Sequence, residues 1–207
     1  MIHHILWDFD GTLFDTYPHM ARAFQRALND LAHPTPMEEI LRQIKRSVTV
    51  CVRHFEALYG LQGELSARYR QHEQQDETDL VRPYAELAPL LRATSEVGIR
   101  HYVYTHRDAS AMDFLRQFAL DGYFTDAITA NDSFPAKPAP DAILFLLTKH
   151  HIAPEDAAMI GDRDIDILAA RNAGIAGCLF DPDHFYDAFT HDWRVPTLAQ
   201  LQTQLLG

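Results

Sequence analysis

The stretch ILWDFDGTLFDT at positions 5–16 decides the fold class, because an apolar run leads directly into two acids separated by one residue. The apolar residues predict a buried strand, and Asp8 and Asp10 follow at its carboxyl end. Two carboxylates held close together repel each other, and a cation between them offsets that cost. Open α/β sheets bind ligands at the carboxyl ends of their strands. We therefore expect a metal-assisted site at the end of the first strand, which should cover residues 2–7.

The composition is that of an ordinary globular protein, with 207 residues, 47% hydrophobic and 23% charged. This length predicts one domain, or a core with a small insertion, that needs no disulfides. Cys51 and Cys178 lie among apolar neighbours, so we expect both to be reduced packing residues in a cytoplasmic protein. The amino-terminal residues do not resemble a secretory signal, and no apolar run approaches the roughly 18 residues of a membrane span.

The net charge of −11 argues against non-specific binding to nucleic acid, although a small phosphorylated molecule remains a suitable partner. The sequence contains neither G-x-x-x-x-G-K-[ST] nor G-x-G-x-x-G, the loops typical of ATP and dinucleotide sites. It leaves the oligomeric state open.

Residues 16–82 predict an all-helical segment that follows the first strand. The apolar positions repeat with a helical period, and His33-Pro34-Thr35-Pro36 interrupts them. The expected helices cover 16–29, 37–44, 48–59 and 64–77. Helical segments inserted into a sheet protein form a separate unit, so we predict a helical cap over 16–82 and a core made of 1–15 and 83–207.

The remainder of the chain alternates between strand and helix, which predicts a parallel sheet with helices on both faces. We expect strands at 99–104, 124–129, 157–160 and 175–180. We expect helices at 84–97, at 108–118 with Asp108 as its cap, at 140–150 and at 165–172. The tail after Asp181 gives no clear pattern.

Four polar segments fall at or near the predicted strand ends. They are Asp8-x-Asp10, Tyr104-Thr105-His106-Arg107, Lys137-Pro138-Ala139-Pro140 and Gly161-Asp162-Arg163-Asp164-Ile165-Asp166. Each carries a group that phosphate chemistry requires: a carboxylate, a hydroxyl or an ammonium. In order and spacing they resemble the haloacid dehalogenase-like hydrolases, in the phosphatase branch with a helical cap after the first strand. The resemblance implies a Rossmann-like core, Mg²⁺ dependence and a phosphoaspartyl intermediate.

Asp8 and Asp10 take different roles in this interpretation. Asp8 would attack phosphorus, since a carboxylate is a competent nucleophile at neutral pH and forms an acyl phosphate that water can open. Asp10 would protonate the leaving oxygen and then accept a proton from the attacking water. Gly11 and Thr12 would support the loop that carries them.

The phosphoryl group would be bound by Thr105, Lys137 and the backbone near the two acids. Thr105 would donate a hydrogen bond to a phosphoryl oxygen, and Lys137, which lies in a loop constrained by prolines, would neutralise charge on the phosphoryl group and Asp8. Phe9, Asp10 and His106 are further candidates for this site. A loop role for His106 and Arg107 remains equally open.

The metal would be held by Asp8, Asp162 and, by resemblance, the backbone carbonyl of Asp10. Ligation by oxygen alone suits Mg²⁺ rather than Zn²⁺. Asp166 lies four residues after Asp162, on the same side of the predicted helix, and would orient the site.

The sequence predicts a phosphatase that acts on a small phosphorylated metabolite, without naming the metabolite. A sugar phosphomutase of the same fold and a non-catalytic regulatory member are the alternatives. A dehalogenase is disfavoured, since that reaction needs neither Asp10 nor a metal. The helical segment carries a basic cluster, which we interpret as a solvated face rather than a substrate contact. Its members are Arg42, Lys45, Arg46 and Arg53.

Overall fold

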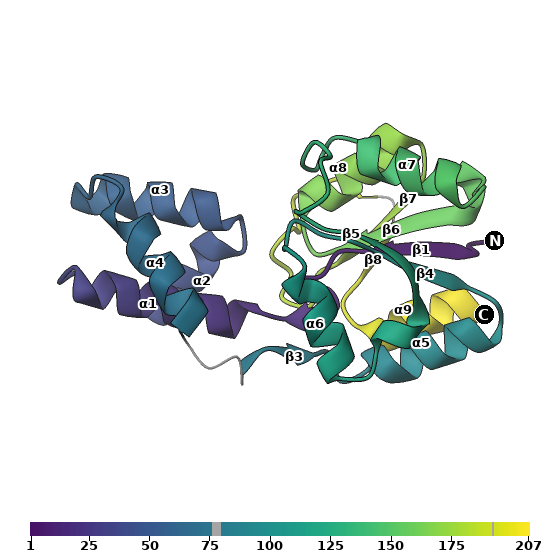
Figure 1. The fold of residues 1–207 in the computed structure, drawn as a ribbon, viewed down its shortest axis with the longest axis horizontal. Coiled ribbons are helices and arrows are strands. Elements are labelled where there is room, and N and C mark those ends of the chain that lie inside the picture. Colours follow the sequence, from purple (N-terminus) through teal and green to yellow (C-terminus); the bar gives the residue numbers. More distant parts are fainter. Residues whose placement is uncertain (76–79, 192) are drawn as a thin grey trace. The chain divides into compact units, whose positions relative to one another are not determined.

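The computed structural model describes residues 1–75, 80–191 and 193–207, and it divides into two compact units. One unit combines Met1–Phe14 with Pro83–Gly207, and the other is Asp15–Arg82. Two short strands, β2 (Phe14–Asp15) and β3 (Arg82–Pro83), pair with each other where the chain passes between the units (Figure 1).

The first unit contains a six-stranded sheet in which every pair of neighbouring strands is parallel. Across the sheet the order is β5-β4-β1-β6-β7-β8, so β1 lies in the interior, where the strand order reverses. This is the doubly wound order of Rossmann-like folds, and it confirms the predicted fold class. The strands are β1 (His4–Trp7), β4 (Arg100–Tyr104), β5 (Phe124–Ile128), β6 (Ala157–Gly161), β7 (Ala176–Phe180) and β8 (Trp193–Val195).

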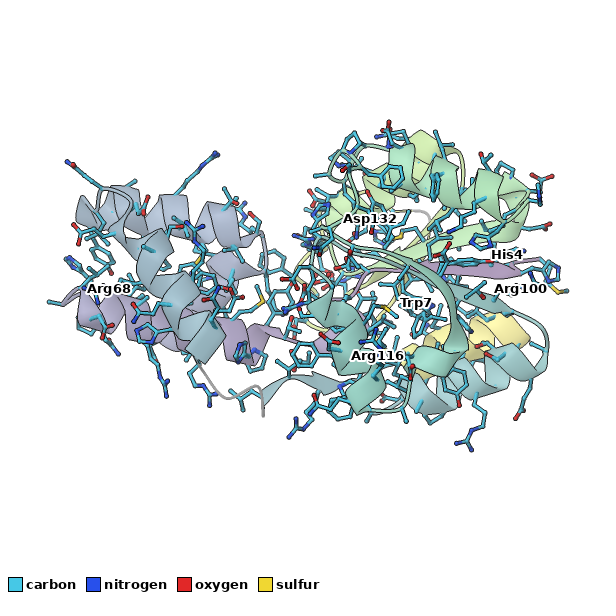
Figure 2. The ribbon with its side chains drawn as sticks, in the orientation of Figure 1. His4, Trp7, Arg68, Arg100, Arg116 and Asp132 are labelled. Atoms are coloured by element: carbon cyan, nitrogen blue, oxygen red, sulfur yellow. The ribbon has the colours of Figure 1, made fainter. Side chains whose placement is uncertain are left out.

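Helices cover both faces of this sheet (Figure 1). Helices α7 (Asp141–Lys149) and α8 (Asp164–Ala173) lie on one face, while α5 (Leu87–Glu96) and α9 (Leu198–Leu206) lie on the other. Helix α6 (Ser110–Gln117) connects β4 to β5. Trp7 ends β1 as a fully buried side chain in the interior (Figure 2). A nonpolar environment on both faces explains why β6 and β7 are continuous runs of apolar residues and glycine.

Several predicted boundaries differ from the structure. The helix predicted at 84–97 begins at Leu87, after a turn, and the helix predicted from Asp108 begins at Ser110. Asp108 nevertheless accepts the backbone N–H of Ser110 on its Oδ1, at 3.0 Å. The tail without a predicted element contains β8 and α9, and the Thr197 hydroxyl caps α9 by accepting the N–H of Gln200.

The second unit is helical and has its own apolar core. Its helices are α1 (Tyr17–Asp30), α2 (Met37–Ile44), α3 (Val48–Tyr59) and α4 (Glu64–Gln75). The rings of Phe24 in α1 and Tyr69 in α4 stack with their centroids 4.1 Å apart. The predicted fourth helix extended to residue 77, but 76 and 77 lie outside the described residues. No helix in the described ranges is both long and apolar enough to cross a membrane.

A buried histidine links β4 to its neighbours inside the first unit. The Nε1–H of Trp7 donates to Nδ1 of His101 at 3.1 Å, so the proton of the neutral ring lies on Nε2. Nε2 is 3.0 Å from the hydroxyl of Thr94, which donates to the carbonyl of Leu90. Burial lowers the pKa of His101 to about 4.

This histidine should make the free energy of unfolding depend on pH. Between pH 6.5, the ordinary histidine pKa, and pH 4 the unfolded chain binds a proton that the folded chain does not, so acid destabilises the fold. Between pH 7 and pH 5 the loss should be about 2 kcal/mol. Urea titrations of wild type and His101→Gln at several pH values measure this contribution as the difference in slope. The exposed His3→Gln is the control, and equal slopes for wild type and His101→Gln would contradict the prediction.

Candidate active site

The register of the central strands brings the predicted site residues to one edge of the sheet. Trp7 pairs with Val103 on β4 and with Ile160 on β6, so the three strands end side by side. Asp8 follows β1, and its backbone N–H donates to the carbonyl of Ile160. Thr105 is likewise the first residue after β4, and Asp162 is the first residue after β6. This edge is the topological switch point of the sheet, where α/β proteins bind ligands.

Lys137 connects two of the acids from the loop before α7. Its Nζ lies 2.6 Å from Oδ1 of Asp8 and 2.7 Å from Oδ1 of Asp166. None of the Lys137 side chain is exposed. Although burial opposes the charge, the carboxylates of Asp166 and Asp8 raise the pKa of Lys137 above its ordinary value. Lys137 is therefore a cation at neutral pH, fixed between two carboxylates.

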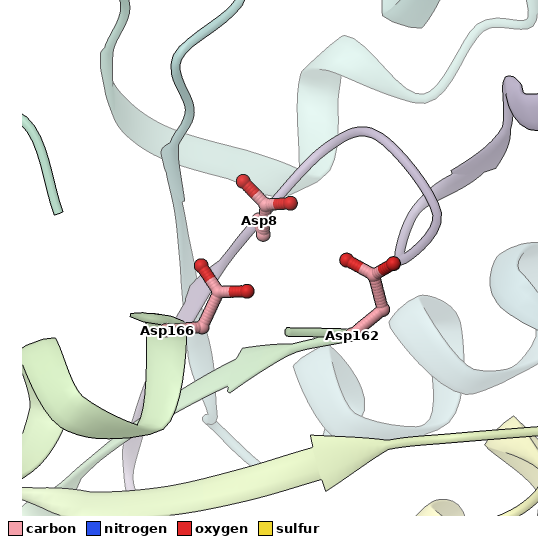
Figure 3. Close-up of side chains that lie close together, drawn as sticks. All are labelled: Asp8, Asp162 and Asp166. Atoms are coloured by element: carbon pink, nitrogen blue, oxygen red, sulfur yellow. The ribbon is translucent and has the colours of Figure 1, made fainter. Parts of the chain in front are cut away.

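Three carboxylates lie close together at this edge of the sheet: those of Asp8, Asp162 and Asp166 (Figure 3). One oxygen of each lies within 4.8 Å of the other two. Oδ2 of Asp8 is buried and has no hydrogen-bond partner among the described residues. An unpaired carboxylate oxygen in the interior is costly, and a cation among the three acids would satisfy it. The donor set fits a divalent metal ion that prefers oxygen.

The charges of this cluster favour the same conclusion. Three carboxyl groups share a largely buried space with one ammonium group, that of Lys137. Burial raises the pKa of Asp8 to about 6, against the opposing attraction of Lys137. The protein alone thus disfavours the charged form that a nucleophile needs, and a divalent cation would restore it.

Gly161 makes room for Asp166. A Cβ built on Gly161 would overlap the Cβ and the carboxyl group of Asp166. Asp166 is fully buried, and its Oδ2 accepts the backbone N–H of Arg163 at 3.1 Å as α8 begins. Glycine at position 161 therefore lets the Asp166 carboxylate lie against the end of β6.

The loop after Asp8 turns sharply at Gly11. Gly11 has a positive φ of 77°, and its N–H donates to the carbonyl of Phe14 at 2.8 Å. A residue with a Cβ is strained in this conformation. The hydroxyl of Thr12, fully buried, lies 3.5 Å from Oδ1 of Asp162. The turn thereby returns the chain towards the acidic cluster.

Asp10 points to a different partner from Asp8. Its carboxylate is paired with the guanidinium of Arg107, and the shortest distance is 2.7 Å, from Nη2 to Oδ1. Arg107 lies two residues after Thr105, and its backbone N–H donates to the Thr105 hydroxyl oxygen at 3.0 Å. With that oxygen accepting, the hydroxyl proton of Thr105 is available to a ligand.

His106 supports the loop of Lys137 through its ring. Its Nε2 accepts the backbone N–H of Lys137 at 2.9 Å, so the proton of the neutral ring lies on Nδ1. Burial, together with the nearby charge of Lys137, lowers the pKa of His106 to about 4. His106 is thus a neutral ring that connects the loop after β4 to the loop before α7.

Two contacts at this edge were not expected from the sequence. The sequence left Arg107 open between a loop role and a site role, and the pairing with Asp10 depends on how β1 and β4 align. Tyr104 was noted only as a strand end, yet its ring centroid lies 4.6 Å from Nζ of Lys137. No pattern in the sequence indicates that contact, since 33 positions separate the two residues.

Comparison with known proteins now identifies the family. The family model described as haloacid dehalogenase-like hydrolase matches residues 5–180. This chain belongs to the haloacid dehalogenase-like hydrolases. The match begins in β1 and ends with β7, so it includes all four polar segments at the sheet edge.

Curated relatives of this hydrolase cover nearly the whole chain. A phosphoglycolate phosphatase from Vibrio vulnificus (strain YJ016) is 32% identical over 216 residues, which cover 95% of this chain and 93% of the relative. The pyrophosphatase PpaX from Listeria monocytogenes serotype 4a (strain HCC23) is 28% identical over 205 residues, with the same coverage. These relatives confirm the prediction of an enzyme of the phosphatase type.

Solved structures show the same fold for this hydrolase. A hydrolase from Streptococcus pneumoniae TIGR4 superimposes with a TM-score of 0.70 at 27% identity, over 99% of this chain and 98% of the other. A HAD-superfamily hydrolase from Geobacter sulfurreducens PCA gives a TM-score of 0.76 at 24% identity, over 100% and 97%. The second match supports the fold alone.

Proposed function

We propose that this protein is a Mg²⁺-dependent phosphatase that hydrolyses a small phosphorylated metabolite through a phosphoaspartyl intermediate on Asp8. One observation carries the proposal. The Asp8 carboxylate is fixed through Oδ1 by the buried Lys137, its Oδ2 has no partner in the described part of the chain, and one of its oxygens lies within 4.8 Å of an oxygen of Asp162. Such an acid is positioned both to bind a metal and to attack phosphorus.

The metal would be held by Asp8 and Asp162, with the backbone carbonyl of Asp10 as the ligand implied by resemblance. Asp166 completes the acidic cluster, but it also accepts a hydrogen bond from Lys137, so we assign it to positioning that lysine. Oxygen ligands select Mg²⁺ over softer metals. When bound, the cation would supply charge neutralisation for the carboxylates and the phosphoryl group.

The reaction would proceed in two displacements on phosphorus. In the first, a carboxylate oxygen of Asp8 forms a bond to phosphorus, the bond to the leaving oxygen breaks, and Asp10 gives that oxygen a proton. In the second, water attacks phosphorus, Asp10 takes a proton from it, and the bond to Asp8 breaks to release inorganic phosphate. Lys137 and the Thr105 hydroxyl would stabilise the charge on the phosphoryl oxygens in both steps. Phe9 and Asp10 would add backbone N–H groups.

The relatives limit the class of substrate without naming it. The names of two of them give phosphoglycolate and pyrophosphate as the compounds on which those proteins act. We extend to this chain only the class of small phosphorylated compounds, with the helical unit Asp15–Arg82 as the part that selects among them. Cys51 and Cys178 are buried and free, which favours a reducing, cytoplasmic location.

A panel of phosphate esters tests the proposal. Sugar phosphates, nucleotides, phosphoglycolate and pyridoxal phosphate would be incubated with the enzyme and Mg²⁺, and released phosphate would be measured. At least one ester should be hydrolysed with Mg²⁺ and not with a chelator. Transfer between sugar positions without release of phosphate would support a phosphomutase instead. No Mg²⁺-dependent turnover across the panel would support a non-catalytic member.

Mg²⁺ should also stabilise the folded protein. A ligand that binds only the folded state raises the free energy of unfolding by about 2.7 kcal/mol at 100 times its Kd. The melting temperature of the wild type should therefore rise by several degrees as Mg²⁺ is added. Asp162→Asn should lose most of this rise. Asp113→Asn, an exposed acid on α6, should keep it. A wild-type melting temperature that is insensitive to Mg²⁺ would contradict the assigned metal site.

A further inference from the structure

The guanidinium of Arg107 holds both oxygens of the Asp10 carboxylate. Its Nε lies 3.0 Å from Oδ1 and 3.2 Å from Oδ2, and its Nη2 lies 2.7 Å from Oδ1. The exposed fractions of the two side chains are only 17% and 25%. A planar guanidinium that donates to both oxygens fixes the orientation of a carboxylate, which the single ammonium of a lysine does not.

Arg107 is itself held in place by aromatic rings. The carbon centre of its guanidinium lies 5.6 Å from the ring centroid of Phe9 and 5.8 Å from that of Phe114. Phe9 belongs to the same loop as Asp10, and Phe114 to helix α6, which follows the Arg107 loop. The backbone N–H of Arg107 is fixed on Thr105. The arginine is thus a rigid support whose charged end reaches Asp10.

We propose that Arg107 is a positioning residue that holds Asp10 where it delivers a proton to the leaving oxygen. This inference rests on the proposed phosphatase function. As the bond between phosphorus and the leaving oxygen breaks, that oxygen gains a proton from Asp10. Arg107 keeps its own protons and forms no bond to the substrate, so its effect on the reaction passes through the place and angle of the Asp10 carboxylate.

The identity of the leaving group distinguishes positioning of Asp10 by Arg107 from the other roles that Arg107 could have in this enzyme. An aliphatic alkoxide leaves poorly unless it is protonated, whereas p-nitrophenolate leaves readily without a proton. Misplacing Asp10 should therefore slow the first displacement with aliphatic esters and have little effect on the first displacement with p-nitrophenyl phosphate. The second displacement, in which Asp10 accepts a proton from water, is the same for both esters, so the comparison uses the first displacement alone. Loss of the fold, of the nucleophile or of phosphate binding would slow the first displacement with both esters.

The test compares wild type, Arg107→Met and Arg107→Lys with glycerol 2-phosphate and p-nitrophenyl phosphate. For Arg107→Met we expect the single-turnover rate of leaving-group release to fall by about 100-fold with glycerol 2-phosphate, the usual scale of acid–base catalysis, and by less than about 3-fold with p-nitrophenyl phosphate. The ester concentration that gives half of the maximal single-turnover rate should stay within about 2-fold for both esters, since only transition-state contacts change. Arg107→Lys should fall between wild type and Arg107→Met.

A double-mutant cycle and a matched control complete the design. If Arg107 acts through Asp10, then Arg107→Met should cause no further loss in an Asp10→Asn enzyme. Arg116→Met is the control, because Arg116 is an exposed arginine on α6 (Figure 2). It pairs with Asp113 on the same helix. Arg116→Met should behave like the wild type with both esters.

The possible outcomes distinguish this inference from the function on which it rests. Equal losses of the single-turnover rate with both esters would show a structural role and overturn the inference alone. A higher half-saturating ester concentration with an unchanged maximal single-turnover rate would assign Arg107 to substrate binding and would also overturn it. Wild-type enzyme that hydrolyses neither of these esters nor any member of the panel would overturn the proposed function together with the inference.

Discussion

Asp8→Asn is expected to abolish turnover while the protein stays folded. The amide has nearly the same shape as the carboxylate, but it cannot form the acyl phosphate on which the proposed reaction depends. Loss of an attacking residue typically lowers kcat by about 10⁴-fold or more. The measurement is phosphate release from the best ester of the panel, with mass spectrometry of rapidly quenched enzyme to detect a phosphoryl group on residue 8.

The stability of Asp8→Asn provides an independent check. Because burial raises the pKa of Asp8 from its ordinary value of 3.8 to about 6, ionised Asp8 destabilises the metal-free folded state at neutral pH. The neutral amide removes this cost and Lys137 keeps Asp166 as its carboxylate partner, so the metal-free variant should melt at the same temperature as the wild type or higher. An Asp8→Asn enzyme that hydrolyses p-nitrophenyl phosphate at the wild-type rate would contradict the mechanism.

Lys137→Met is expected to impair both catalysis and stability. The substitution leaves the buried carboxylates of Asp8 and Asp166 without the ammonium that lies within 2.7 Å of each. Removing one partner from a buried ion pair costs about 3–5 kcal/mol, which denaturant titration of the metal-free proteins would measure. The phosphoryl group also loses a positive charge, so kcat should fall by about 100-fold or more at saturating Mg²⁺.

Lys149→Met is the matched control for this prediction. Lys149 lies on α7 and contacts Asp126 at 2.7 Å, a similar distance, but its side chain is 48% exposed. Exposed ion pairs contribute about 0–1 kcal/mol, so this variant should unfold and turn over like the wild type. Equal effects of the two substitutions would show that burial of Lys137 has no special importance.

The fold class and the identity of the acidic residues could be predicted from the sequence because their signals are local. The apolar run before Asp8 indicates a strand, and the alternation after Pro83 indicates a parallel sheet. Once the sheet is parallel, the carboxyl ends of its strands meet, which brings Asp8 and Asp162 together although 154 positions separate them. The structure adds that β1 lies between β4 and β6.

The remaining features depend on tertiary contacts that leave no periodic signal. Strand β8 spans Trp193–Val195 alone and is defined by its pairing with β7, so no local pattern distinguishes it from a loop. The pairing of Arg107 with Asp10 depends on how the loops that follow β1 and β4 lie relative to each other. The place of Asp166 against β6 depends on the missing side chain of Gly161, whose role appears only when both elements are present.

The interior position of β1 has a consequence for how the protein is made. A ribosome synthesises β1 first, yet its hydrogen-bonding partners β4 and β6 begin at Arg100 and Ala157. A nascent chain that ends before β6 carries Asp8 and Asp10 directly after a strand with an unpaired edge, and such an edge is prone to aggregation. The acids therefore gain their surroundings only in the last quarter of translation. Enzyme activity in a translation reaction would consequently report the completion of the sheet rather than the synthesis of the residues that react.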